Sequence, residues 1–374
     1  MFSYDEYRQR IDNCFKNRRF TISMPEEERS TILKELQCPE ETIELYQYRK
    51  CNDYSFDDYK NNQITLAHPK YFNDMFDVMP YINLDEFINT FNKLNLSAVK
   101  RYFNILQNRD FTEQEIQELG SNNTAVVIKN IFQQFQCNEN LFYANFDTIR
   151  NYALLQTAPD LCQICLFKRN ETRIACFSEN YDSPIMWGHY ADSSKGFCVG
   201  RRLPVKLSMA PCPSNCSKKK GEIDSCINYN CINNGNNWLF PIIYCSERPD
   251  FTKDIEEQFV QTQFQKIGLN LDWNNYNLFS HLKFACYKSS DWKYEREWRW
   301  IHTLCSNEIP DFSPISVGTI SGLYLGEQIS QEHEAILKEY ASKHKLPDGS
   351  NIPIYKMTTD LCNPQYKLTA KRIL

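Results

Sequence analysis

The sequence lacks three features that would place it in a broad class of protein. It has no apolar run of the roughly 18 residues that a membrane-spanning helix needs, and its first residues lack the charged start and apolar run of a signal peptide. It has no basic surplus either, because 42 lysines and arginines face 47 aspartates and glutamates, for a net charge of -5 and a pI near 5.8. A general nucleic-acid binder carries such a surplus. We therefore expect a cytoplasmic protein with no membrane partner, in which any basic pocket for a phosphate-bearing ligand is local.

Four common catalytic motifs are also missing from the sequence. Neither a GxxxxGK[ST] loop nor a GxGxxG loop is present to hold phosphates. A GxSxG nucleophile elbow is absent, and so is an HExxH metal-binding helix. These absences disfavour P-loop NTPases, Rossmann dehydrogenases, serine hydrolases and zincins.

The composition is that of a folded protein with a large core. The chain has 374 residues and is 42% hydrophobic and 14% aromatic. Segments typical of strands and of helices are mixed without regular βα alternation, which predicts an α+β fold. We expect a helical N-terminal segment over residues 1–40 and a single α+β catalytic domain over 41–374. That domain would carry a helical insertion at about 81–160 and a cysteine-rich insertion at about 202–238.

Sixteen cysteines are an unusual number for a chain without an export signal. Most are expected to be reduced, buried thiols. The exception is a group within a Lys-, Asn- and Gly-rich stretch, where four thiols could clamp the chain around zinc. Its spacing lacks the two close CxxC pairs of a zinc ribbon, so a metal-free surface insertion is the favoured interpretation. The zinc candidates are Cys212, Cys216, Cys226 and Cys231.

The segment 292–299 reads Trp-Lys-Tyr-Glu-Arg-Glu-Trp-Arg and is expected to begin a β-strand. Because alternate residues of a strand point to the same side, Glu295, Glu297 and Arg299 would share one face. Glycosyl transfer needs two such acids, one to stabilise a positively charged sugar transition state and one to activate the nucleophile. The alternative interpretation is a salt-bridged edge strand in which Arg299 neutralises the acids.

Two further candidates end expected strands. Residues 45–49 form an aromatic, alternating segment that predicts a strand, and Arg49 at its end is suited to a bidentate grip on phosphate oxygens. Residues 173–178 predict another strand, and Ser178 at its end would orient a sugar or position the acid-bearing strand. A surface ion pair for Arg49 and a turn cap for Ser178 are the alternatives.

A third group of candidates lies in two short segments. Residues 186–191 are expected to be helical, and His189 with Tyr190 beside it is suited to bonding a ribose or to acid–base chemistry. Asn73, after Phe72, belongs to either a polar turn or a ligand-contacting loop. A core histidine and a simple turn are the alternatives.

The order of these blocks resembles an uncharacterised bacterial family, domain-of-unknown-function family 2971. The resemblance covers about residues 45–330 and is strongest around His189 and Glu297. Some members of this family are thought to belong to defence or toxin loci, but the family name implies no activity. The blocks are Tyr48-Arg49, Phe72-Asn73-Asp74, Cys176-Phe177-Ser178-Glu179, Met186-Trp187-Gly188-His189-Tyr190-Ala191, Gly196-Phe197-Cys198 and Trp292-x-Tyr294-Glu295-x-Glu297-x-Arg299.

An arginine, a serine and a Glu-x-Glu pair on successive strands also resemble the Arg-Ser-Glu pattern of ADP-ribosyltransferases. This resemblance implies a split β-sheet core and NAD as substrate. It implies that Arg49 contacts the NAD phosphates, Ser178 the nicotinamide side and Glu297 the ribose 2′-hydroxyl, while Glu295 serves the acceptor. Aromatic neighbours such as Tyr48 and Tyr190 would stack on a ring of the cofactor.

Three functions remain open at this point. The first is an NAD-consuming ADP-ribosyltransferase or NAD hydrolase, acting as a defence or toxin effector on an unknown protein or nucleic-acid acceptor. The second is a metal-dependent nuclease or phosphodiesterase, with His189 as the acid–base group and Glu295 and Glu297 on the metal. The third is a non-catalytic nucleotide- or phage-sensing module, in which changing Glu297 would leave function intact while changing Arg49 would weaken ligand binding.

Overall fold

The computed structural model of the chain describes residues 3–21, 24–93, 96–119, 125, 128–129, 132–133, 140, 143–144, 161–205, 238–256, 258–259, 277, 279–303, 310–362 and 364–374. Within these ranges, no helix combines the length and the apolar character needed to cross a membrane. The four zinc candidates, Cys212, Cys216, Cys226 and Cys231, lie outside the described residues.

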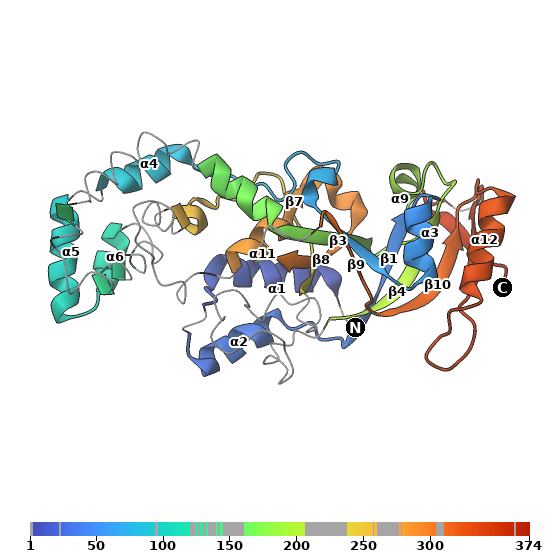
Figure 1. Ribbon diagram of the computed structural model, residues 1–374, viewed down its shortest axis with the longest axis horizontal. Coiled ribbons are helices and arrows are strands. Elements are labelled where there is room, and N and C mark those ends of the chain that lie inside the picture. The colour runs from blue at the N-terminus through green and yellow to red at the C-terminus, as the bar shows by residue number, and fades with distance from the viewer. Residues whose placement is uncertain are drawn as a thin grey trace.

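One mixed sheet forms the centre of the described structure (Figure 1). Its ten strands are β1 (Thr42–Arg49), β2 (Ile64–Ala67), β3 (Thr172–Ser178), β4 (Phe197–Pro204), β5 (Trp238–Pro241), β8 (Glu297–Thr303), β9 (Phe312–Ile315), β10 (Thr319–Leu325), β11 (Ile354–Thr359) and β12 (Leu368–Arg372). Their order is β12-β11-β10-β4-β1-β3-β2-β9, with β8 on β3 and β5 on β8. Only β10 and β11 run parallel in this sheet, among the strands described.

The helices occur between strands in no regular alternation, so the expected α+β fold is confirmed. A small parallel pair, β6 (Ile243–Cys245) and β7 (Tyr287–Ser289), accompanies the main sheet. The described helices are α1 (Tyr4–Asn17), α2 (Glu26–Leu36), α3 (Asp53–Lys60), η1 (Pro69–Tyr71), α4 (Leu84–Lys93), α5 (Leu96–Asn108), α6 (Glu113–Leu119), α9 (Pro184–Tyr190), α11 (Phe279–Cys286), η6 (Ser290–Glu295) and α12 (Gln331–Ala341).

The sheet forks at β3, and this fork creates the site described below. On one edge, β3 pairs with β8 over its whole length. On the other edge, β3 pairs with β1 only at Ser178, opposite Tyr46, and with β2 only at Ile174, opposite Ala67. Among the described strands, the middle of β3 has no partner on this edge, so a gap opens between β1 and β3.

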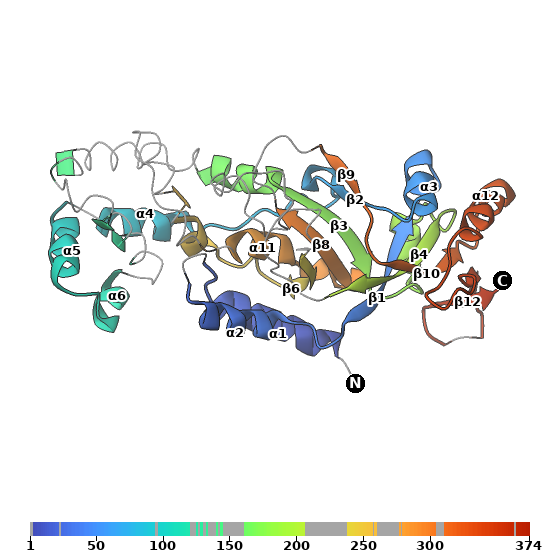
Figure 2. The same cartoon turned by 60° about the horizontal axis from the view of Figure 1, so that its bottom comes forward.

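The two faces of β3 and β8 have different roles because consecutive strand residues point to opposite sides. Trp298 and Trp300 are fully buried on the side of the N-terminal helices, and the ring of Trp298 stacks on Tyr7 of α1 with 5.8 Å between centroids. Figure 2 shows α1 and α2 running along this side of β8. Glu297 and Arg299 therefore face the opposite side.

A second apolar cluster packs against the half of the sheet that contains β4 and β10. Phe56 of α3 stacks on Phe197 of β4 at 6.1 Å, and Leu337 of α12 lies in the same cluster. Figure 1 shows α3 and α12 together beside β4 and β10. β4 pairs with β1 along all of β1, so this packing also holds β1 in place. The other edge of β1 is therefore free to diverge from β3.

The helical insertion has an apolar cluster of its own. Val99, Tyr102 and Phe103 of α5 pack with Phe111 and with Leu119 of α6. In both views α5 and α6 lie at the end of the molecule away from β1 and β4 (Figures 1 and 2). Phe87 of α4, by contrast, packs against Phe259 in the main core. The described helices α5 and α6 therefore form a cluster of their own, away from the gap between β1 and β3.

Candidate functional site

A pocket of about 390 Å³ occupies the gap between β1 and β3. Residues 46–50 form one wall and residues 174–178 another. The rest comes from β2, η1 with the loop after it, α9, β7, η6 and β8. Its volume lies within the range of about 300–1,000 Å³ that small-molecule sites occupy. The forked sheet thus brings strands that are far apart in the sequence to one cavity.

All eight active-site and cofactor-site candidates predicted from the sequence line this pocket. No described residue of the helical insertion does so. The eight are Tyr48, Arg49, Asn73, Ser178, His189, Tyr190, Glu295 and Glu297.

One expectation about the acid pair is wrong. Glu295 does not lie on a strand, because it ends the 3-10 helix η6, and β8 begins only at Glu297. Arg296 between them adopts the left-handed conformation, with φ 48° and ψ 48°, which breaks the strand alternation. The two carboxylates meet in the pocket through this turn and not through i, i+2 spacing.

A buried lysine joins the two acids. Lys288 Nζ lies 2.6 Å from Glu295 Oε2 and 3.1 Å from Glu297 Oε2. Each of the three side chains is less than 5% exposed. A lysine is almost never buried to this extent unless it is paired, so the acids and the ammonium form one unit. The sequence did not identify Lys288 as a site residue.

A second cation holds Glu297 from the other side. Arg299 Nε donates to Glu297 Oε1 at 2.7 Å, and its two terminal nitrogens grip Asp77 at 2.6 and 2.7 Å. Arg299 and Asp77 are almost completely buried. The salt-bridged interpretation of this segment is therefore correct for Glu297, but the pair lies in a pocket wall and not at a surface edge.

The environments of the two acids push their proton affinities apart. Burial, and then the negative charge of Glu297, raise the pKa of Glu295 to about 7. Burial also acts to raise the pKa of Glu297, but the charges of Arg299 and Lys288 outweigh it and hold that pKa below its usual range. Two neighbouring carboxyls with separated pKa values are the pattern of a general acid–base group beside a permanently ionised one.

Ser178 positions the acid pair and does not present its hydroxyl to the cavity. Its Oγ donates to the backbone oxygen of Glu295 at 2.7 Å and accepts from the backbone N–H of Asn180 at 3.1 Å. The residue is 1% exposed. The contacts support two of the roles considered from the sequence: the bond to Glu295 positions the acids, and the bond from the Asn180 N–H caps the turn after β3.

Arg49 also lines the pocket, with its side chain 27% exposed. Its Nη2 is 3.4 Å from Asp58 Oδ2, a long contact that leaves donors of the guanidinium for a ligand. Burial, and then the positive charge of Arg49, lower the pKa of the nearby Arg201 to about 10, while Asp58 acts to raise it. Arg201 itself is buried and bonds Asn62 Oδ1 and the backbone oxygen of Gln63, so the cations that line the pocket here are Arg49 and Lys50.

A hydrogen-bonded chain leads from the pocket rim to Glu295. Asn73 Nδ2 donates to Tyr190 Oη at 3.0 Å, and Tyr190 Oη donates to Glu295 Oε1 at 2.5 Å. His189 is exposed at the rim, and its Nδ1 lies 3.1 Å from Tyr294 Oη. Tyr190 is therefore a hydrogen-bond donor to the acid, which is a different role from the stacking that the resemblance implied.

Burial limits the chemistry of two further pocket residues, Tyr48 and Cys176. Tyr48 donates to the backbone oxygen of Asn180 at 2.7 Å and meets Trp187 edge to face at 5.4 Å, so it supports the wall. Burial, and then the charge of Glu297, raise the pKa of the Cys176 thiol well above its usual value. A thiol kept protonated in this way is a poor nucleophile.

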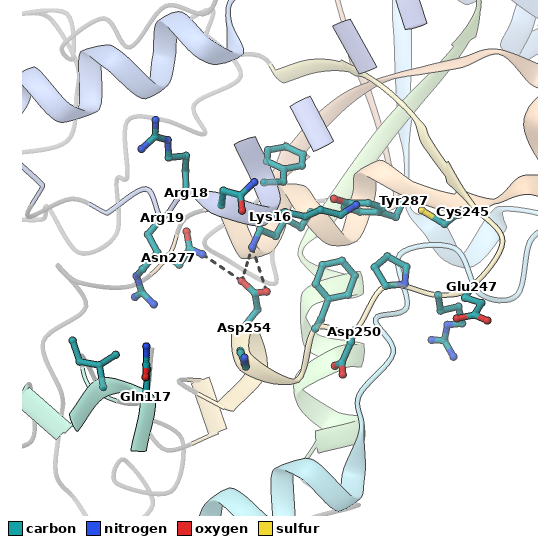
Figure 3. Close-up of a pocket in the computed structure, with 18 residues that line it drawn as sticks. Lys16, Arg18, Arg19, Gln117, Cys245, Glu247, Asp250, Asp254, Asn277 and Tyr287 are labelled. Carbon is teal, nitrogen blue, oxygen red and sulfur yellow. Dashed lines mark hydrogen bonds and ion pairs between the residues drawn. The ribbon is translucent and has the colours of Figure 1, made fainter. Parts of the chain in front are cut away.

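A second cavity of about 800 Å³ lies on the other side of β7 (Figure 3). Its central acid, Asp254, accepts hydrogen bonds from Lys283, Asn277 and Ser280. At its rim, Arg18 pairs with Glu35. The cavity has a basic surplus, because its charged lining residues are Lys16, Arg18, Arg19, Arg248, Lys253 and Lys283 against Glu247, Asp250 and Asp254. Among these, Lys283 and Asp254 form an ion pair at 3.1 Å.

No group of three or more His, Cys, Asp or Glu side chains is arranged to hold a metal ion within the described ranges. Glu295 and Glu297, the metal ligands of the nuclease hypothesis, point at Lys288, and Glu297 also at Arg299. The zinc site considered from the sequence stays a prediction, because its residues lie outside those ranges. These residues are Cys212, Cys216, Cys226 and Cys231.

Comparison with known proteins reaches the same region of the chain. No curated protein and no solved structure matches it. One family model matches a part of the chain that contains His189, Lys288, Glu295 and Glu297. Arg49, Ser178 and the earlier blocks of the expected resemblance lie before the matched part. Residues 186–300, from α9 into β8, match the family model described as "Protein of unknown function (DUF2971)".

Proposed function

We propose that the pocket between β1 and β3 binds NAD and breaks the bond between its nicotinamide and ribose, with transfer of ADP-ribose to a macromolecule or to water. The observation that carries this proposal is the convergence of Arg49, Ser178 and the Glu295–Glu297 pair on one cavity. These residues come from three strands and a 3-10 helix that are far apart in the sequence.

The acid end of the pocket suits the chemistry of a glycosidic bond. As the C1′–N1 bond breaks, its electron pair leaves with the nicotinamide and positive charge develops on the ribose, which a fixed carboxylate stabilises. Glu297, held ionised by Arg299 and Lys288, supplies that carboxylate. Glu295 then takes the proton of the acceptor as the acceptor bonds to C1′.

The charges that line the pocket suit the charge of the ligand. Arg49 keeps guanidinium donors beyond its long contact with Asp58, which favours a diphosphate. Around the acid pair, Asp77, Glu297 and an ionised Glu295 outnumber Arg299 and Lys288. This negative surplus favours the positively charged nicotinamide ring and the transition state that follows from it.

The same contacts favour glycosyl transfer over metal-dependent cleavage of a phosphodiester. A divalent ion on the two acids would have to displace Lys288 Nζ from contacts of 2.6 and 3.1 Å. Cations that are already paired with the carboxylates leave few lone pairs for a hard metal ion, which takes six or more oxygen ligands. A role as a defence or toxin effector, which the family resemblance implies, stays a prediction.

An experiment with adenylate-labelled NAD tests the proposal. The purified chain is incubated with the label in buffer and in cell lysate, and the products are followed by mass spectrometry. Label on a protein or nucleic acid, or free ADP-ribose, is the expected result. Intact NAD in both conditions, under all salt and pH conditions, would count against the proposed function.

Arg49→Ala is expected to weaken NAD binding by about ten- to a hundred-fold, because a charge-assisted contact to phosphate is worth about 1.5–3 kcal/mol. Calorimetric titration with NAD measures this, and Lys60→Ala, on the exposed surface of α3, is the control. Equal affinity of the wild-type and Arg49→Ala chains would show that Arg49 does not hold the diphosphate.

A further inference from the structure

Lys288 is a charged residue of the pocket to which neither the sequence pattern nor the family match assigns a role. Lys288 is buried between Glu295 and Glu297, and its ammonium also lies 4.7 Å from the centre of the Trp292 ring. Burying a cation is costly unless its partners are fixed around it. Its position beside both acids therefore calls for an explanation beyond general stability.

The local fold directs this lysine into the pocket. Lys288 is the middle residue of β7, whose neighbouring residues point to opposite sides. Tyr287 points away and donates to Asp12 Oδ1 of α1 at 2.7 Å. The chain then turns into η6, where Ser289 accepts from the backbone N–H of Asp291. Anchors on both sides thus aim Lys288 at the acids.

We propose that Lys288 is a positioning residue of this site, whose single ammonium holds both carboxylates in register and keeps Glu295 ready to accept a proton during the reaction. This inference rests on the proposed function for its catalytic meaning, but the proton exchange itself can be measured without any substrate.

The contacts show why Lys288 affects the two acids unequally. Glu297 keeps Arg299 as a second cation at 2.7 Å if Lys288 is removed. Among the ion pairs of the described residues, Glu295 has Lys288 as its cation at 2.6 Å, and it otherwise accepts from the neutral Tyr190. Loss of Lys288 therefore leaves Glu297 ionised and deprives Glu295 of the charge that favours its ionised form.

Other charged or titratable groups also face this acid pair. They lie on every element that packs against the pair, and each stays in place when Lys288 is changed. These groups are Asp77 after η1, Cys176 of β3, His189 and Tyr190 of α9, Tyr244 of β6, Tyr294 of η6 and Arg299 of β8.

The test is a titration of the Glu295 carboxyl carbon by NMR in the ligand-free chain, with the signal assigned by its loss in Glu295→Gln. Wild type is expected to titrate near pH 7, in line with the raised pKa of about 7 for Glu295. Lys288→Met is expected to move the midpoint up by about 1–3 units, the effect of a lost opposite charge within 4–6 Å. Lys288→Arg is expected to restore it.

Lys283→Met is the matched control, because Lys283 is likewise a buried lysine paired with a carboxylate, Asp254 at 3.1 Å. It is expected to leave the Glu295 midpoint unchanged. If Lys288→Met does not fold, Lys288→Gln keeps a hydrogen-bond donor, on a slightly shorter side chain, without the charge. An unchanged Glu295 midpoint in the folded variant would overturn the proposal.

A pH profile of NAD turnover on the same proteins separates this inference from the proposed function. The rising limb is expected near pH 7 in wild type, since Glu295 must be ionised to accept a proton and its pKa is about 7. In Lys288→Met this limb is expected to move to higher pH.

A shifted titration with no NAD turnover in any variant would support the role of Lys288 and overturn the NAD activity. A loss of turnover that is the same at every pH would indicate a merely structural role and contradict the proposal.

Discussion

Glu297→Gln is expected to lower the rate of nicotinamide release by about 10²–10³-fold, the usual effect of removing a group that stabilises charge in a transition state. Glutamine keeps the size of the side chain but cannot balance the positive charge that develops on the ribose. The carboxylate that it replaces is held ionised by Arg299 and Lys288. The rate is measured as released nicotinamide, at several NAD concentrations so that kcat and KM are separated.

Because Glu297 is buried and paired, its replacement also disturbs stability, and the control must match that loss. Asp254→Asn removes the charge of another buried carboxylate, paired with Lys283 at 3.1 Å and outside the pocket. It is expected to cost comparable stability and to leave kcat unchanged. A Glu297→Gln chain that is folded and retains the wild-type kcat would show that this carboxylate does not take part in the chemistry.

Arg299→Met is expected to lower the free energy of unfolding by about 3–5 kcal/mol, which is typical when one partner of a buried ion pair is removed. The change leaves Asp77 buried without the two contacts of 2.6 and 2.7 Å that Arg299 now supplies. It also removes the 2.7 Å contact to Glu297. Urea denaturation followed by circular dichroism measures the difference.

Arg18→Met provides the comparison for this stability effect. Arg18 also pairs with a carboxylate, Glu35 at 2.6 Å, but its side chain is 50% exposed. Such surface pairs contribute about 0–1 kcal/mol. If Arg299→Met were no more costly than Arg18→Met, the ion-pair network would not be what holds β8 against the loop at Asp77.

Local pattern was enough to predict two of the strands that carry the site. Alternating aromatic residues predicted the strand that ends at Arg49, and an apolar run predicted the strand that ends at Ser178. Polar residues at the ends of these strands indicated a site because strand ends meet loops. The geometry of the acid pair was predicted wrongly, since the left-handed turn at Arg296 has no glycine or other marker in the sequence.

The partners of the acids could not be predicted from local pattern. Asp77 reaches Arg299 across 222 residues of sequence, and nothing around Asp77 distinguishes it from other surface aspartates. Lys288 is only seven positions before Glu295, but a lysine in a mixed segment is usually solvated. Its burial follows from the anchoring of Tyr287 on α1, which is a tertiary contact. Residue types at strand ends therefore predicted where the site lies. The charges that surround its acids could be identified only from the folded structure.

Nicotinamide released from NAD by the purified chain in cell lysate, measured between pH 5 and 9 for wild type and for Glu297→Gln in parallel, decides whether this pocket is an NAD-cleaving site. The proposed activity predicts release by wild type that rises as Glu295 ionises, near its pKa of about 7, and that is nearly abolished in Glu297→Gln. Release at the same rate from both proteins, or from neither at any pH, would contradict it.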